Sequence, residues 1–97
     1  MKLVRDKTPE ITKEHKFKTV SELNLVYSDT LKQKLIEEVD EYLEAKTKEE
    51  KTEELADILE VLYAILDDEK IYLDELEEIR LKKFNKHGGF EKQIMMM

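Results

Sequence analysis

Two clusters of acidic residues stand out in this sequence because of their internal spacing. Each has three carboxylates: Glu37, Glu38 and Glu41 in the first, and Glu53, Glu54 and Asp57 in the second. Helix positions three or four apart lie on one face, so each cluster would present its carboxylates on one side of a helix. Like charges this close repel one another unless a cation lies between them. Hard divalent cations prefer carboxylate oxygen, and the spacing therefore indicates a site for Mg²⁺ or Mn²⁺, with one ion or two.

The competing interpretation is an ordinary solvated helix face. Asp and Glu together number 24 of the 97 residues, and many of them lie outside the two clusters. Most acidic runs in such a chain simply face water. One detail favours the cation site: Asp57, and to a lesser degree Glu54, stands beside a strongly apolar run where a solvated acid is less expected.

Three helices are expected to carry these residues. Ser28 or Asp29 is suited to cap the first, which would run to about residue 45. The second is expected over residues 48–68, with Thr47 and Glu50 in the pattern of a capping box. The third would run over residues 73–87, and the diglycine at 88–89 would end it.

The N-terminal part of the chain shows weaker patterns. Pro9 is expected to end a short first segment, and the Lys-rich residues 10–20 are interpreted as a loop or a short irregular arm. Ser21 is suited to cap a short turn that ends near Leu25. No alternating strand pattern is present, so the predicted fold class is all-α.

A short turn at residues 46–48 would make the first two helices an antiparallel hairpin. Glu41 and Glu54 stand at similar distances from that turn, so the two acidic clusters are expected to face each other across a groove. Lys34 lies one helical turn before Glu38 and is expected on the same face, where it would be able to meet a phosphate oxygen.

The second helix is apolar around nearly its whole circumference between residues 55 and 66. A helix of that kind is normally buried on all sides, which two other helices cannot achieve. We therefore expect this helix to pack against its copy in a second subunit and to complete a four-helix bundle. The predicted state is a homodimer or a higher homo-oligomer.

Size and composition limit the function classes. The 97 residues are expected to form a single domain, 1–97, and the net charge of −7 argues against binding to nucleic acid. The chain has no cysteine, which excludes disulfides and Cys-ligated metals. The N-terminus lacks an apolar leader pattern, and the longest apolar stretch is too short for a bilayer, so a cytoplasmic protein without membrane contact is expected.

The order of these motifs resembles the signature of the MazG-like all-α nucleoside triphosphate pyrophosphohydrolases. That superfamily includes the dimeric dUTPases and phosphoribosyl-ATP pyrophosphohydrolase. Its pattern of Glu-Glu-x-x-Glu, a gap of twelve residues and Glu-x-x-Asp corresponds here to residues 37–41 and 54–57. The opening Lys2-Leu3-Val4-Arg5-Asp6-Lys7-x-Pro9 and the closing Gly88-Gly89-Phe90 resemble a compact MazG-like subgroup, although Thr8 stands where an apolar residue is expected.

The resemblance implies hydrolysis of a nucleoside triphosphate to a nucleoside monophosphate and pyrophosphate, with Mg²⁺ as cofactor and Mn²⁺ as a substitute. By match to the motif, the expected metal ligands are Glu38, Glu41, Glu54 and Asp57. The catalytic set would also include Glu37 and Glu53, which match positions that assist the ligands or orient water. The phosphate-binding candidates are Arg5 and Lys7, with Lys34 and Lys83 as looser ones.

The role expected from the resemblance is removal of non-standard or surplus nucleotides. Two alternatives remain open from the sequence. One is a non-catalytic acidic helical dimer that binds a partner or a regulatory nucleotide. The other is a reaction of the phosphoribosyl-ATP pyrophosphohydrolase type. It ranks lower because the two terminal motifs favour the MazG-like subgroup.

Overall fold

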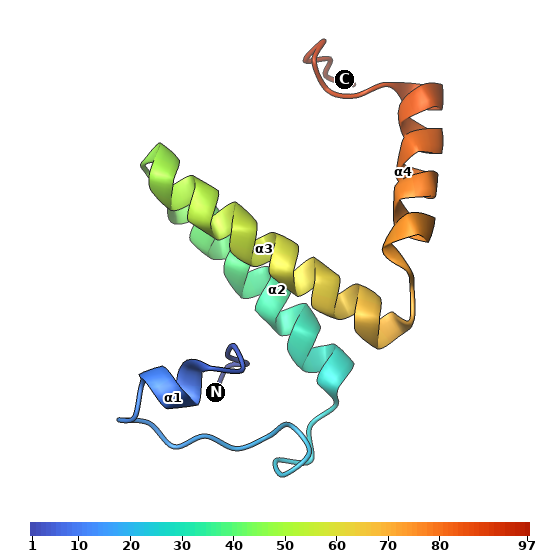
Figure 1. Ribbon diagram of the computed structural model, residues 1–97. Coiled ribbons are helices and arrows are strands. Elements are labelled where there is room, and N and C mark those ends of the chain that lie inside the picture. Colours follow the sequence, from blue (N-terminus) through green and yellow to red (C-terminus); the bar gives the residue numbers. More distant parts are fainter.

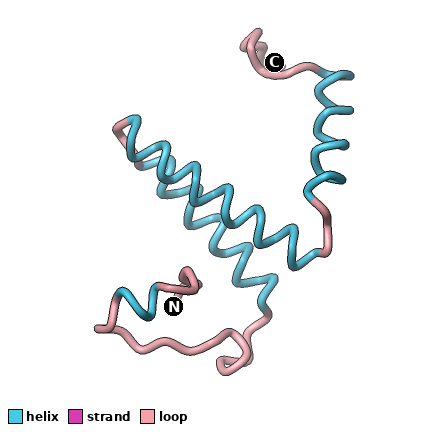
Figure 2. Tube along the Cα trace, viewed as in Figure 1, coloured by secondary structure: helices cyan, strands magenta, loops and turns pink.

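The computed structural model describes residues 1–97 and contains helices but no strands. The elements are α1 (Thr8–Ile11), α2 (Tyr27–Glu44), α3 (Lys48–Glu69) and α4 (Leu73–His87). In Figure 1, α2 and α3 lie side by side as a hairpin, and α4 stands apart from both. Figure 2 shows that short loops join α2 to α3 and α3 to α4, whereas a long loop leads from α1 to α2. The all-α class, the helical hairpin and the third long helix are therefore confirmed.

The start of α2 differs from the expectation. The helix begins at Tyr27, and its N-cap Val26 makes no side-chain capping bond. The Val26 carbonyl accepts hydrogen bonds from the backbone N–H groups of Asp29 and Thr30, at 3.1 and 3.2 Å. Ser28 and Asp29 therefore lie inside the first turn instead of capping it. There, the Asp29 carboxylate is favourable to the positive end of the helix dipole.

The start of α3 confirms the expected cap. The Thr47 side chain accepts a hydrogen bond from the Glu50 backbone N–H at 3.1 Å. The Glu50 carboxylate in turn accepts from the Lys46 N–H at 3.1 Å, one residue before the N-cap. These two bonds satisfy backbone donors that a helix start otherwise leaves unpaired. They fix the sharp turn that brings α3 back along α2.

The N-terminal region is more ordered than the sequence indicates. Pro9 does not end the first segment but lies in the first turn of α1, where the missing N–H of proline costs nothing. The later turn begins at Thr19 and not at Ser21. Thr19 and Glu22 exchange hydrogen bonds between side chain and backbone at 2.9 and 3.1 Å.

The helices α3 and α4 each end at a residue with a positive φ angle. Lys70 adopts a left-handed conformation with φ 58°, and the Ile71 N–H bonds to the Leu66 carbonyl at 2.9 Å, which closes α3. Gly88, with φ 79°, ends α4 where the sequence predicts, and its N–H bonds to the Phe84 carbonyl at 2.7 Å. Positive φ suits glycine at that position.

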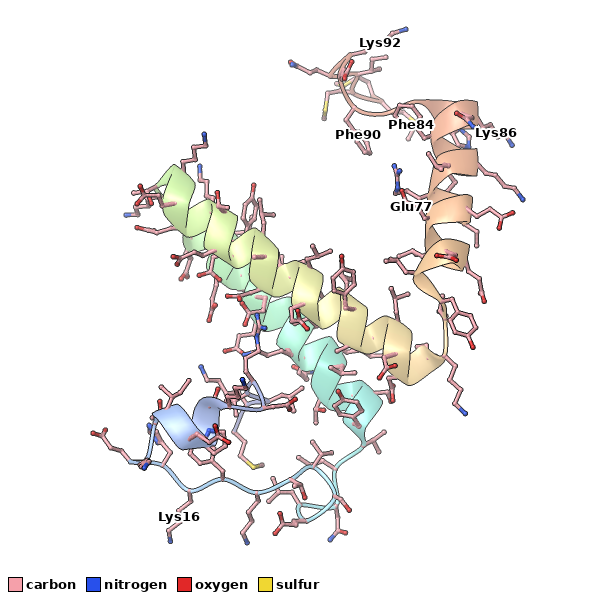
Figure 3. The ribbon with its side chains drawn as sticks, viewed as in Figure 1. Lys16, Glu77, Phe84, Lys86, Phe90 and Lys92 are labelled. Carbon is pink, nitrogen blue, oxygen red and sulfur yellow. The ribbon has the colours of Figure 1, made fainter.

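Very little of a single chain is buried. Leu31 and Val61 are the only buried apolar residues, and Glu38 is the only other buried residue. Apolar side chains remain exposed on each long helix: Ile36, Val39 and Leu43 on α2; Leu55, Leu59, Leu62 and Tyr63 on α3; Leu73, Leu76, Ile79, Leu81 and Phe84 on α4. Figure 3 shows Phe84 and Phe90 at the far end of α4, away from the hairpin. None of the helices is both long and apolar enough to span a membrane.

Replacing Thr47 with alanine tests the role of the cap. Thr47→Ala should lower the free energy of unfolding by about 1 kcal/mol, because the Glu50 N–H loses its partner at the α3 start. Thr52→Ala is the matched control: its hydroxyl bonds only to the Lys48 carbonyl inside the helix, where alanine has the higher propensity. Urea unfolding followed by circular dichroism measures both, and equal midpoints for the two variants would contradict the assignment.

Candidate metal centre

Three carboxylates converge where α2 faces α3. One oxygen each from Glu38, Glu41 and Glu54 lies within 4.8 Å of the other two. Glu38 and Glu41 stand one turn apart on α2, and Glu54 comes from α3, brought opposite them by the 45–47 loop. Two oxygens on opposite sides of a bound Mg²⁺ or Ca²⁺ lie about 4–5 Å apart, so the spacing of these three oxygens suits such an ion. The structure thus brings together three of the four ligands expected from the sequence.

Two of these carboxylates hold oxygens that nothing in the chain satisfies. Glu38 is 5% exposed, and its Oε2 atom is buried without a hydrogen-bond partner. The Oε2 atom of Glu54 is in the same condition. An unpartnered buried carboxylate oxygen is costly, and a cation is the usual solution. The donor set, all carboxylate oxygen, fits a hard divalent ion and does not fit a soft one.

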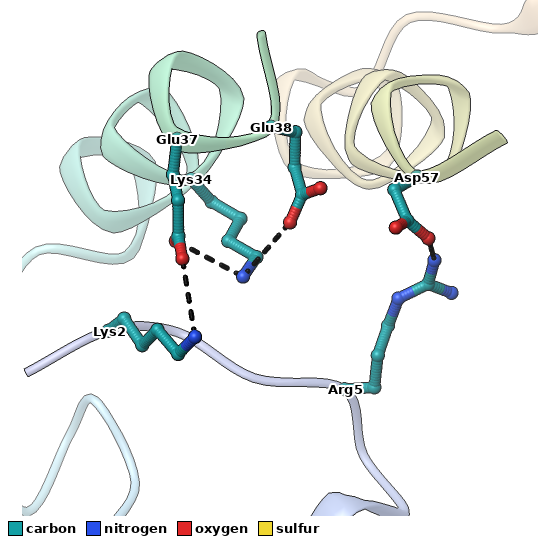
Figure 4. A network of polar contacts seen from close by, with 6 residues as sticks. All are labelled: Lys2, Arg5, Lys34, Glu37, Glu38 and Asp57. Atoms are coloured by element: carbon teal, nitrogen blue, oxygen red, sulfur yellow. Dashed lines mark hydrogen bonds and ion pairs between the residues drawn. The ribbon is translucent and has the colours of Figure 1, made fainter. Parts of the chain in front are cut away.

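Asp57, the fourth expected ligand, is engaged elsewhere. The Arg5 guanidinium donates from Nη2 to the Asp57 Oδ1 atom at 2.7 Å (Figure 4). The N-terminal segment therefore reaches across the groove and contacts α3. The same segment contacts α2, because the Lys2 ammonium lies 3.4 Å from the Glu37 carboxylate. Lys2 had no assigned role from the sequence, since nothing in helical periodicity places an N-terminal residue against α2.

Lys34 is an internal counter-ion for two carboxylates of α2. Its ammonium is 3.1 Å from Glu38 and 3.2 Å from Glu37, and its side chain is only 15% exposed. Burial alone would lower the pKa of Lys34, but hydrogen bonds to Glu38 and Glu37 outweigh it and raise the pKa. Burial likewise opposes ionisation of Glu37, but Lys34 and Lys2 lower its pKa overall. Both groups are therefore held in their charged forms.

The carboxyls of Glu38 and Glu41 show the opposite behaviour. Burial is the main reason that the pKa of Glu38 is raised, and the charges of Glu41 and Asp57 add to it against the pull of Lys34. The pKa of Glu41 is also raised, first by burial and then by the adjacent Glu54. Without a metal these groups resist ionisation, which is the electrostatic mark of a site built for added positive charge.

The remaining candidates lie outside this cluster within one chain. Glu53 is exposed on α3, and Lys7 precedes α1 without an ion pair. Lys83 belongs to α4, which stands apart from the hairpin in Figure 1. A shallow hollow of about 230 Å³ opens beside the cluster and is lined by Glu41, Glu44, Ala45, Glu50 and Glu54. Its lining is strongly acidic, so an anionic ligand would need a cation to approach it.

The helical hairpin and its facing carboxylates agree with the resemblance to the MazG-like all-α pyrophosphohydrolases. A comparison with protein-family models matches residues 1–83 to the phosphoribosyl-ATP pyrophosphohydrolase family, and the chain belongs to that family. It is accordingly a pyrophosphohydrolase of nucleotide-type substrates, a hydrolase that acts on acid anhydrides. This family is metal-dependent in general, in keeping with the carboxylate cluster. Comparisons with curated proteins and with solved structures found no match.

Neutralising Glu41 should stabilise the metal-free protein. Folding raises the pKa of Glu41 above its ordinary 4.5, so the proton is bound more tightly in the native state. That contribution to stability is present below about pH 4.5 and is lost as the pH rises through the raised native pKa. At pH 7 in EDTA, Glu41→Gln should therefore melt at a higher temperature than the wild type.

The advantage of Glu41→Gln should shrink as the pH falls below the ordinary pKa of 4.5, because the wild-type carboxyl then takes up its proton. Asp40→Asn, which removes an exposed carboxylate next to the cluster, is the control and should show no such pH-dependent gain. Calorimetry at equal protein concentrations measures all three proteins. A wild type that is more stable than Glu41→Gln at pH 7 would contradict the interpretation.

Proposed function

We propose that the protein hydrolyses a nucleoside triphosphate between its α and β phosphates, with Mg²⁺ as cofactor and Mn²⁺ able to replace it. The observation that carries the proposal is that Glu38 and Glu54, whose carboxylates converge between the two hairpin helices of a pyrophosphohydrolase chain, each hold a buried oxygen without a partner. Water and the triphosphate give a nucleoside monophosphate and pyrophosphate.

Each carboxylate has a role in this proposal. Glu38, Glu41 and Glu54 hold the metal, and Asp57 is the fourth ligand by its motif position and by its proximity to Glu38. Held by these carboxylates, Mg²⁺ would reduce the negative charge that the phosphates meet and would supply Lewis-acid activation of the attacking water. Glu53 is exposed at the edge of the cluster, where it is able to orient a water.

The chain's own cations serve two purposes. Lys34 and Lys2 keep Glu37 ionised and fixed, which holds one wall of the groove in place. Arg5 is the cation best placed for phosphate, because its planar guanidinium already lies at the mouth of the groove. Lys7 and Lys83 are further phosphate candidates, the latter from α4 of a second copy.

The family supports one specific second substrate. Its name is that of an enzyme that releases pyrophosphate from phosphoribosyl-ATP, a substrate with the same triphosphate group. The acidic groove is able to serve either compound, since the cleaved anhydride is the same. Removal of surplus or non-standard nucleotides is the role we propose first, because the motifs at both ends of the chain resemble the compact MazG-like subgroup.

A substrate panel tests the reaction. Nucleoside and deoxynucleoside triphosphates and phosphoribosyl-ATP, each with Mg²⁺, should yield the monophosphate and pyrophosphate in at least one case. Loss of a group that supports a metal ligand costs about 10–100-fold in activity. Glu41→Gln and Asp57→Asn remove proposed ligands themselves, so each should lower kcat/KM by about 100-fold or more. Glu49→Gln, in the first turn of α3, is the control and should retain activity. Release of orthophosphate alone would contradict the reaction type.

We also propose that the active form is a homo-oligomer, a dimer at least, which completes a four-helix bundle around α3. One chain exposes 9263 Å² of surface, whereas a compact monomer of 11.6 kDa exposes about 5,800 Å². The excess is several times the roughly 800 Å² per partner that a stable interface needs. The exposed Leu55, Leu59 and Leu62 on α3 follow helical spacing and would form the contact.

Light scattering coupled to size-exclusion chromatography measures the assembly. At micromolar concentration the wild type should have at least twice the mass of one chain, and Leu59→Arg should reduce the mass or unfold the protein. Ile94→Arg changes an exposed apolar residue in the C-terminal tail and should leave the mass unchanged. A folded wild-type monomer would overturn the proposed assembly.

A further inference from the structure

The N-terminal segment brings a cation to a carboxylate that the metal centre also needs. Arg5 bonds to Asp57 at 2.7 Å, while the oxygens of Glu38, Glu41 and Glu54 converge without Asp57. Fifty-two residues separate Arg5 from Asp57 along the chain, so the contact is a tertiary one. Figure 4 shows the Arg5 guanidinium, carried by the N-terminal segment, facing the Asp57 carboxylate of α3.

From this geometry we infer that Arg5 is a built-in counter-ion which competes with the metal for Asp57. In the metal-free protein the guanidinium holds the Oδ1 atom of that carboxylate. When the metal centre fills, Asp57 turns to the ion and Arg5 is released at the mouth of the groove, where it is free to meet a phosphate. Metal binding would thus prepare the phosphate-binding group, and the inference rests on the proposed metal site.

The strength of the Arg5–Asp57 pair suits such an exchange. Its two side chains are 56% and 40% exposed, and ion pairs in that setting contribute about 0–1 kcal/mol. A bond of that strength positions Asp57 but yields to a divalent ion. The neighbouring Lys34 pairs differ, because the Lys34 side chain is only 15% exposed and bridges two carboxylates. Lys34 is therefore the permanent counter-ion, and Arg5 the exchangeable one.

Lys2 gives the segment a second contact, which does not involve Asp57. Its ammonium contacts Glu37, which is not one of the converging ligands, so the contact is not lost when the metal centre fills. Between Lys2 and Arg5 lie only Leu3 and Val4, both half-buried. These contacts do not depend on the Arg5–Asp57 bond, so release of Arg5 does not require the whole segment to detach.

The test measures Mn²⁺ affinity without nucleotide, by the loss of the free-ion signal in electron paramagnetic resonance. Arg5→Gln should bind Mn²⁺ about two- to fivefold more tightly than the wild type, as expected from removal of a competitor worth up to about 1 kcal/mol. Lys2→Gln removes an equal charge from the same segment without touching Asp57 and is the matched control. Its gain should be clearly smaller.

A double-mutant cycle separates competition at Asp57 from a general loss of positive charge. In an Asp57→Asn background, Arg5→Gln should no longer tighten Mn²⁺ binding. In the wild type, the guanidinium ¹⁵N resonance of Arg5 should shift when Mg²⁺ is added.

The outcomes are distinguishable. A wild type that binds no Mn²⁺ would remove the proposed metal site together with the inference. A wild type that binds Mn²⁺, with Arg5→Gln unchanged or weaker, would overturn the inference alone. So would equal gains in Arg5→Gln and Lys2→Gln, or a gain that persists in the Asp57→Asn background.

Discussion

The packing of α2 against α3 is the constraint on which the rest of the structure depends. It forces Glu38 and Glu41 of one helix against Glu54 of the other, with one oxygen of each within 4.8 Å of its neighbours. Such crowding of like charges is unfavourable, and the chain offsets part of it with Lys34 beside Glu38 and with Arg5 beside Asp57. Two buried oxygens still lack partners. In the proposed function, a divalent cation would supply the missing charge.

The sequence predicted the helices and the convergence because both follow from local rules. Helical spacing places Glu38 and Glu41 one turn apart, and the Thr47 cap fixes where α3 begins, so Glu54 falls opposite. The state of Asp57 was not predictable in this way. Its partner Arg5 lies 52 residues away in a segment without helical period, and several cations along that segment were equally suitable by composition. The predicted start of α2 was also wrong. The N–H groups of its first turn bond to a backbone carbonyl instead of a capping side chain, and side-chain patterns do not reveal such a bond.

Function and stability draw on the same small interface. Leu31 and Val61 are the only buried apolar residues of a single chain, and the buried Glu38 occupies space that a hydrophobic residue would otherwise fill. A chain of 97 residues has few other sources of stability. In the proposed assembly a second copy covers the apolar faces of α3 and α4, so the hairpin is able to keep its costly carboxylates. The charged groove and the oligomer are then two consequences of one packing arrangement.

The most direct measurement of the central claim is the anomalous scattering of Mn²⁺ in crystals of the full chain grown or soaked with that ion. The account predicts a peak enclosed by the carboxylates of Glu38, Glu41 and Glu54, with Asp57 turned toward it and away from Arg5. An ion bound elsewhere on the chain, with these three carboxylates unoccupied at saturating Mn²⁺, would contradict it.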